Sequence, residues 1–328
     1  MQIASTSKEL ESSLRVAYLY FSGMKQKDIA RQLRITPSTV SRAISRARHF
    51  VELRYTIPGD DQTEARLLLK YPLLDTIVVE SAGVSQSTVI VGQAAARYFV
   101  LNVQQKDTVA LSCGETLLEM VKALPVLQSL TLSLTQLSVE GDPEAVHQSP
   151  ATLIGLVSSK ISRCSASTAI QLPPLGTVTN DSEFRKNLKN SSLLSGLRER
   201  ALKSRIVFIG AAPVERGVVQ ASSFMSIKST ATRDIIKRQA VRLRAVGEIN
   251  NRLYDEMGRD VTSDIECLDS VFIKIVDLSD LKTLVRKGAK VVLVAAGAKK
   301  AQAVRAAISS GIANVLITDK ELAQSLLQ

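Results

Sequence analysis

The sequence QKDIARQLRITPSTVSRAI, residues 26–44, has the pattern of two short helices joined by a tight turn. Apolar residues at spacings of three and four predict one helix over residues 26–33 and a second that begins at Pro37. Proline is favoured in the first turn of a helix, and Thr36 directly before it is a candidate N-cap. Arg34 stands in the turn, at a position where a positive φ is common and glycine is usual. The pattern predicts a helix-turn-helix.

Three apolar residues occupy the positions at which these helices must contact each other. Ala30 is small where the helices cross, Ile35 fills the turn, and Val40 seats one helix on the other. The buried face of the helix that begins at Pro37 is predicted to consist of Val40, Ala43, Ile44 and Ala47. A further helix is predicted over residues 9–21, with an apolar stripe formed by Leu10, Leu14, Ala17, Tyr18 and Phe21. We therefore expect a three-helix unit.

The remaining face of the helix that begins at Pro37 is polar and basic. Short hydroxyl side chains let a helix lie deep in the major groove, where Arg42 can read a guanine edge through two hydrogen bonds. Arg46 and Arg48 are better placed for phosphates, as are Lys25 and Lys27, and such contacts fix the register without specifying sequence. The candidate DNA-binding residues are Lys25, Gln26, Lys27, Pro37, Ser38, Thr39, Ser41, Arg42, Arg46 and Arg48. The alternative is an ordinary three-helix unit with a solvated charged face.

The net charge of +11 is concentrated near the N-terminus. Residues 1–58 contain ten Lys or Arg and four Asp or Glu, so they hold +6 of this excess in under a fifth of the chain. A basic face attracts polyanions, and duplex DNA presents a dense row of phosphates. A solvated basic surface would show the same charge, so the helix pattern decides in favour of DNA.

Composition argues against several other classes of protein. Aromatic residues make up 4% of the 328 residues and Trp is missing, which does not suit a stacking surface for single-stranded nucleic acid. The cysteines, Cys113, Cys164 and Cys267, have no CxxC spacing and predict neither a disulfide framework nor a metal site. The sequence shows neither a signal core nor an apolar run of about 18 residues. We expect a cytoplasmic protein without membrane segment, metal or cofactor.

Beyond residue 58 the pattern changes to short β-rich runs that alternate with helical periods. The predicted strands cover residues 76–80, 108–111, 132–137, 169–172, 206–210, 272–275, 290–295 and 314–318. The predicted helices cover residues 88–101, 116–124, 152–162, 281–286, 299–309 and 320–327. Such alternation predicts right-handed crossovers and a doubly wound, mostly parallel α/β sheet. With a short strand over 51–57 and a turn or linker at 58–61, we expect a helix-turn-helix domain, 1–58, and an α/β domain, 59–328.

Two short segments of the α/β part suit an anionic ligand. A strand that ends near Gly114 and runs into a helix presents free backbone N–H groups, and Thr116 can add a hydroxyl. An ordinary βα turn has the same pattern, and the Gly, Lys and Ser/Thr spacing of a Walker loop is missing. Lys299 and Lys300 begin a helix, where the dipole disfavours cations. A nearby anion would offset that cost, although a solvated lysine pair explains the sequence as well.

These segments together resemble the SorC family of bacterial sugar-sensing repressors and activators. The likeness rests on Ser41-Arg42, Arg46-Ala47-Arg48 and Val51-Glu52-Leu53-Arg54, and then on residues 109–117, 245–258, 294–301 and 311–319. The resemblance implies a winged helix-turn-helix and an effector domain similar to sugar-phosphate isomerases. It further implies that a phosphorylated sugar alters operator affinity, and that dimers pair into tetramers.

The resemblance also implies roles for single residues. By position, Gly114 and Thr116 would meet the phosphate with help from Lys300, while Glu248 would bond sugar hydroxyls. The candidate effector-binding residues are Cys113, Gly114, Glu115, Thr116, Glu248, Asp255, Gly297 and Lys300. The carboxylate of Glu115 repels an anion unless it points away, so an unphosphorylated polyol or sugar acid stays open as the effector.

An isomerase-like enzyme is the main alternative, because the same type of sheet serves such enzymes. The sequence shows no nucleophile–base pair, metal cluster or dinucleotide fingerprint, and His147 follows a Gly-Asp-Pro turn typical of a surface loop. An interaction adaptor would need an exposed apolar helix face, which the sequence does not demonstrate. We expect no catalysis, and as partners we expect double-stranded operator DNA, a small sugar or sugar-phosphate effector and further copies of the chain.

Overall fold

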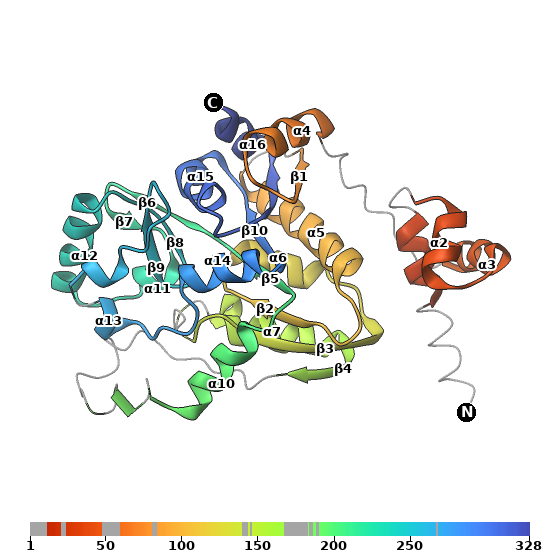
Figure 1. Ribbon diagram of the computed structural model, residues 1–328, viewed down its shortest axis with the longest axis horizontal. Coiled ribbons are helices and arrows are strands. Elements are labelled where there is room, and N and C mark those ends of the chain that lie inside the picture. The colour runs from red at the N-terminus through yellow and green to blue at the C-terminus, as the bar shows by residue number, and fades with distance from the viewer. Residues whose placement is uncertain are drawn as a thin grey trace. The chain divides into compact units, whose positions relative to one another are not determined.

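The computed structural model describes residues 12–20, 24–47, 60–80, 84–139, 144, 146–166, 183, 186–187, 190–266 and 268–328 (Figure 1). The chain separates into two compact units, one with the N-terminal helices and one with nearly all residues from 56 onward. Each unit has a core of its own. None of the helices in the described ranges is long and apolar enough to cross a membrane.

The N-terminal unit contains a helix over residues 12–20, α2 (Gln26–Leu33) and α3 (Pro37–Ala47). The predicted bounds of α2 and the predicted start of α3 are confirmed. The core of the unit consists of Val16, Leu19, Ile29, Ala30, Val40, Ala43 and Ile44, with Leu33 and Ile35 packed against it. Burial of this apolar set stabilises helices that are too short to be stable alone in water.

The first helix buries a face that differs from the predicted one, although Ala17 of the predicted stripe is buried. Leu14 is 37% exposed, whereas Val16 and Leu19 are buried. Leu10 and Phe21, the two ends of the predicted stripe, lie outside the described residues. The prediction was wrong at Leu14 because one helix carries apolar residues on two overlapping faces, and only its partners select the face that is buried.

The C-terminal unit is built on a seven-stranded sheet. Its strands are β1 (Asp75–Val79), β2 (Thr108–Leu111), β3 (Leu127–Gln136), β4 (Ile161–Ala166), β5 (Ile206–Ile209), β10 (Lys290–Ala295) and β11 (Val315–Asp319). Their order is β1-β11-β10-β5-β2-β3-β4, and the pairs from β1 through to β3 are parallel. The predicted mostly parallel α/β sheet is therefore confirmed.

Helices cover both faces of this sheet. They are α4 (Asp61–Lys70), α5 (Val84–Asn102), α6 (Glu115–Ala123), α7 (Pro150–Ser159), α10 (Ser192–Ala201), α14 (Leu278–Arg286), α15 (Ala301–Ser309) and α16 (Lys320–Leu327). The crossovers through α5 and through α15 run in opposite directions along the sheet, so right-handed connections place these two helices on opposite faces. Accordingly α5 packs with α6, while α15 packs with α16 and α16 packs with α4.

A second, antiparallel sheet lies between β5 and β10 in the sequence and was not predicted. It contains β6 (Ala212–Glu215), β7 (Val218–Val219), β8 (Ala245–Ile249) and β9 (Arg252–Asp255), in the order β7-β6-β8-β9. The short helices α11 (Ser222–Met225) and α13 (Leu268–Val271) and the longer α12 (Thr230–Arg242) accompany it (Figure 1). Strands of two to five residues are too short to show a clear alternation, so sequence periodicity did not reveal them.

Two local predictions were wrong, and two lie outside the described residues. Residues 272–275 form the loop between α13 and α14, where Phe272 packs on Phe224 with ring centroids 4.6 Å apart. The apolar run there fills a core without being a strand. Asp60 is the N-cap of α4, accepting a hydrogen bond from the Thr63 N–H, so a helix begins at Asp61 within the predicted turn. The strands predicted over 51–57 and 169–172 lie outside the described residues.

Candidate functional site

The turn between α2 and α3 has the predicted geometry. Arg34 takes a left-handed conformation, with φ 55° and ψ 44°, in the position where glycine is usual. The Ile35 N–H donates to the carbonyl of Ala30 at 3.0 Å, which closes the turn on α2. Thr36 caps α3 by accepting a hydrogen bond from the Thr39 N–H at 3.2 Å. These contacts fix the orientation of α3 relative to α2.

The predicted DNA-contacting side chains lie on the outside of this unit. The exposed members are Lys25, Lys27, Pro37, Ser38, Ser41 and Arg42, and the partly buried ones are Gln26 and Thr39. Within the described residues, no ion pair engages Arg42, so its guanidinium is available to a partner. The side chain of Arg46 and all of Arg48 lie outside the described residues. Sequence and structure thus place one polar, basic face on α3 and the start of α2.

The first hydroxyl groups of α3 also contact each other. The Thr36 hydroxyl lies 2.9 Å from that of Ser38 and 2.8 Å from that of Thr39. Because a hydroxyl can both donate and accept, Ser38 and Thr39 can hold this cap and still bind a phosphate. Ser41 has no such contact among the described residues.

In the C-terminal unit, the strand order reverses between β2 and β5. From β2 the chain continues to β3 on one side, whereas β5 leads through the second sheet to β10 on the other. In open α/β sheets, ligands bind at the carboxyl ends of the strands beside such a reversal. The candidate effector site is therefore at the carboxyl ends of β2, β5 and β10.

The turn after β2 forms one wall of this site. Gly114 is the N-cap of α6, with φ 121° and ψ 162°, and no side chain of the described residues caps the helix. The Gly114 N–H donates to the carbonyl of Gln148 at 3.2 Å, while the next N–H groups open the helix. An uncapped helix N-terminus is a ready site for an anion. Thr116 is buried and Glu115 is exposed at the same helix start. Cys113, just before the turn, is partly buried.

Gly114 holds a backbone conformation that is nearly restricted to glycine. A Cβ at this position would meet no atom within 4 Å, so a Gly114→Ala substitution acts through the backbone alone. We expect this variant to lose about 1–3 kcal/mol of unfolding free energy and to bind the effector more weakly. Urea denaturation measures the first effect. Gly196→Ala, inside α10 and equally free of contacts, is the matched control and should be neutral or slightly stabilising. Equal destabilisation of both variants would contradict the assignment.

The turn after β10 forms a second wall. Gly297 has φ 92°, and its N–H donates to Asp319 Oδ2 at 2.9 Å. Asp319 Oδ1 accepts from the Leu322 N–H at 3.0 Å, so this buried carboxylate ties the turn to the start of α16. Lys300 follows in the 3-10 turn η3 (Ala298–Lys300).

Lys300 lies close enough to Glu115, at the start of α6, for the two charges to interact. Burial lowers the pKa of its ammonium, while the charges of Glu115 and Asp319 raise that pKa. Within the described residues the ammonium forms neither a hydrogen bond nor a close ion pair, whereas Lys299 beside it is exposed. The structure therefore brings two predicted segments, 113–116 and 297–300, together around a cation with unused donors.

The second sheet places Glu248 beside the same edge. Glu248 pairs in register with Ala212, two residues after Gly210 at the end of β5. It is 7% exposed, and its carboxylate accepts a hydrogen bond from the Asn251 N–H.

The residue before it, Gly247, allows close packing of the second sheet. A Cβ on Gly247 would lie 2.4 Å from the Tyr254 ring and 2.7 Å from Ala303 Cβ. Only glycine lets α15, which follows Lys300, pack this closely on β8.

Burial raises the pKa of the Glu248 carboxyl from 4.5 to about 7, and the Asn251 N–H offsets part of that rise. The unfolded chain loses this proton first, so Glu248 makes the free energy of unfolding fall between about pH 4.5 and pH 7. The full effect is about 3 kcal/mol, present below this window and lost above it. Glu248→Gln should remove this dependence, so denaturation at pH 5 and pH 8 should show a smaller difference than in the wild type. Parallel pH curves for both proteins would contradict the raised pKa.

Asp255 has a different environment. Burial raises its pKa, but the backbone and side chain of Arg259 and the Met257 N–H more than compensate, so the pKa is lowered. Asp255 Oδ1 accepts hydrogen bonds from the backbone N–H groups of Met257 and Arg259, and the Arg259 guanidinium contacts Oδ2 at 2.6 Å. These contacts engage the carboxylate in the turn after β9.

Sequence reasoning missed the tip of the β8–β9 hairpin. Asn250 and Asn251 both have positive φ, 54° and 62°, as a two-residue hairpin turn requires. The Ser112 hydroxyl, at the end of β2, donates to Asn250 Oδ1 at 2.6 Å. Asn250 is 6% exposed, and its Nδ2 has no hydrogen-bond partner among the described residues. An unused donor at the end of β2 suits a ligand oxygen, and the Asn-Asn pair between two apolar runs was the signal that could have revealed it.

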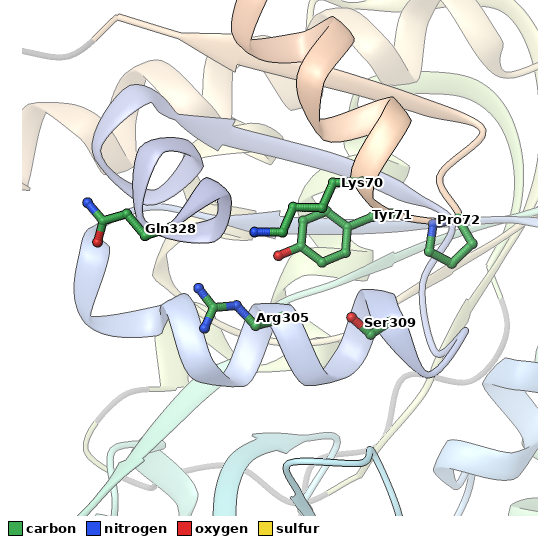
Figure 2. A pocket seen from close by; sticks show the side chains of 6 residues that line it. All are labelled: Lys70, Tyr71, Pro72, Arg305, Ser309 and Gln328. Atoms are coloured by element: carbon green, nitrogen blue, oxygen red, sulfur yellow. The ribbon is translucent and has the colours of Figure 1, made fainter.

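A surface hollow beside α16 lies outside this site (Figure 2). It is lined by Lys70, Tyr71, Pro72, Arg305, Ser309 and Gln328. Lys70 and Tyr71 donate to the carbonyl of Leu326, and Arg305 donates to that of Ser325. Cations at a helix C-terminus satisfy the last carbonyls and favour the dipole, which explains these residues without a ligand.

Comparison with known proteins identifies the family of this chain. The "Sugar-bind" family model, which describes a sugar-binding domain, matches residues 55–328, and the model for sigma-70 region 4 matches residues 3–50. The chain belongs to the SorC family of sugar-binding transcriptional regulators. Its named relatives are regulators of transcription.

Individual relatives match nearly the whole chain. The deoxyribonucleoside regulator of Bacillus subtilis (strain 168) is 26% identical over 326 residues, which covers 96% of each chain. The transcriptional regulator LsrR of Escherichia coli (strain K12) is 24% identical and covers 98% of this chain and 95% of its own. Among solved structures, the full-length sorbitol operon regulator SorC from Klebsiella pneumoniae has a TM-score of 0.66 at 19% identity. It covers 98% of this chain and 100% of its own.

Proposed function

We propose that this SorC-family regulator binds an operator through α3 and that a small phosphorylated sugar changes its operator affinity. The sugar phosphate binds at the carboxyl ends of β2, β5 and β10. Residues 1–58 form the DNA-binding domain, and residues 59–328 bind the effector and assemble the oligomer. A dimer with a two-fold axis suits a palindromic operator, and pairing of dimers gives a tetramer.

One observation carries the choice of a phosphorylated effector. The uncapped N-terminus of α6 and the Lys300 ammonium belong to the same site, and neither has its hydrogen-bonding capacity filled by the described residues. A phosphate accepts hydrogen bonds from backbone N–H groups and forms stronger, charge-assisted bonds with an ammonium. It would also offset the cost of keeping Lys300 charged in a partly buried place.

The neighbouring groups suit a sugar. Glu248, whose pKa of about 7 lets it both donate and accept near neutral pH, can bond two hydroxyls. Asn250 Nδ2 supplies a further donor at the end of β2. Asp255 contributes least to this proposal, because its carboxylate is engaged by Arg259 and Met257.

A second candidate is an unphosphorylated polyol or sugar acid. Glu115 favours it, because an exposed carboxylate at the start of α6 lowers the positive potential around Lys300. In that case Lys300 would pair with a carboxylate of the effector or with Glu115 itself.

A thermal-shift screen of the full chain separates these candidates. The panel contains sugar phosphates, the matching free sugars and polyols, and sugar acids. A ligand at one hundred times its Kd stabilises the folded state by about 2.7 kcal/mol. We expect one sugar phosphate to raise the Tm and to change binding to an operator selected from random duplexes, while its free sugar does neither. Stabilisation by free sugars alone would overturn the phosphate assignment.

A further inference from the structure

The basic charge of the C-terminal unit gathers on one small part of the chain. Residues 59–328 carry +5 of the net charge, and residues 215–244 alone contain seven Lys or Arg against two acids. The rest of that unit is therefore neutral. The seven cations are Arg216, Lys228, Arg233, Lys237, Arg238, Arg242 and Arg244, and all of them are exposed.

Most of these cations lie on or beside α12, on the outside of the second sheet (Figure 1). Ile236 and Ala240 turn the apolar side of α12 into the core of that sheet, with Val214 and Val219. The opposite side presents Lys237, Arg238 and Arg242 to solvent. We name the outer surface of α12 formed by Arg233, Lys237, Arg238 and Arg242 the α12 basic face.

The α12 basic face is costly for the isolated chain. Arg233 and Lys237 stand four residues apart on the helix, as do Arg238 and Arg242, and like charges at this spacing destabilise a helix. Among the described residues, none of the four cations forms an ion pair within 4 Å, and Asp234 is the one acid of the helix. An anionic partner would offset this repulsion.

We propose that the α12 basic face binds the phosphate backbone of duplex DNA, as a second DNA contact besides α3. A duplex presents one charge per about 1.7 Å of its axis, so a row of cations meets several phosphates together. The face is arginine-rich and carries Val241 as its one exposed large apolar residue, which does not suit insertion into a membrane surface. Phosphate contacts of this kind raise affinity without specifying sequence.

The test uses full-length protein and a long random-sequence duplex over a series of salt concentrations. Lys237→Gln, Arg238→Gln and Arg242→Gln are combined in one variant. The matched control combines Arg66→Gln, Arg286→Gln and Lys287→Gln, which removes the same charge at exposed positions elsewhere. Each lost phosphate contact flattens the slope of log K against log salt by about 0.9. We expect the slope for the α12 variant to be flatter by the equivalent of about two phosphate contacts. The variant should keep the sequence preference and the Tm of the wild type.

Equal slopes for the two triple variants would overturn the proposal. A normal slope with lost binding to polyglutamate would also overturn it, and would assign the face to an acidic protein. The proposal rests on DNA binding by this regulator, but its failure is separable. If the wild type binds duplex and Arg42→Ala weakens sequence preference while the α12 variant behaves as the control, only the second contact is wrong.

Discussion

Replacing Lys300 with Ala should strongly weaken the response to a sugar-phosphate effector while leaving DNA binding intact. Lys300 is the cation that the structure places by the uncapped start of α6, and burial lowers its pKa. A hydrogen bond to a charged group contributes about 1.5–3 kcal/mol, so its loss weakens effector binding roughly tenfold to a hundredfold. The substitution removes a partly desolvated charge, so we expect the variant to fold at least as stably as the wild type.

Lys299→Ala is the matched control for this prediction. It removes the same charge from the same 3-10 turn, but the Lys299 side chain is exposed. Effector affinity is measured by calorimetry, and release or recruitment of operator by anisotropy, in all three proteins. An unaltered response in Lys300→Ala would remove Lys300 from the site. An equal loss in both variants would mean that general charge, and not a specific contact, supports effector binding.

The bounds of helices and strands were predicted best where the local sequence pattern and the tertiary packing agree. The bounds of α2, β2, β10 and α16 follow directly from periodicity, caps and turn residues. Their apolar sides are the sides that the cores bury. Leu14 shows the limit, because the pattern of a helix does not fix its rotation when two apolar stripes overlap.

The effector site could be predicted only in pieces. Gly114 and Lys300 were found as separate turns, because nothing in the sequence says that β2 and β10 are separated by one strand. The packing of the second sheet depends on long-range contacts, such as that between Gly247 of β8 and Ala303 of α15, which no local sequence pattern reveals. Asn250 was missed for this reason: its importance comes from Ser112, 138 residues away along the chain.

Exchanging Arg42 for Ala should reduce the preference for the operator over other sequences, whereas Lys25→Ala should weaken binding to all duplexes alike. Both side chains are exposed on the helix-turn-helix, so neither substitution should affect its core. A bidentate contact from an arginine to guanine is worth about 1–3 kcal/mol of discrimination. A phosphate contact carries no sequence information. Its loss reduces the slope of log K against log salt by about 0.9, the value for one phosphate contact.

The two variants should therefore differ in which property they lose: Arg42→Ala loses base preference, and Lys25→Ala loses affinity for every duplex. Sequences selected from a random duplex pool give the base preference, and a salt series on a single duplex gives the number of phosphate contacts. Thr36 and Arg34 hold α3 at a fixed angle to α2, so a residue on the exposed side of α3 meets the same base in every complex. If Arg42→Ala selected the wild-type sequence and only its salt slope changed, Arg42 would be a phosphate contact. The reading of bases would then belong to other residues of α3, with Ser41 the first to test.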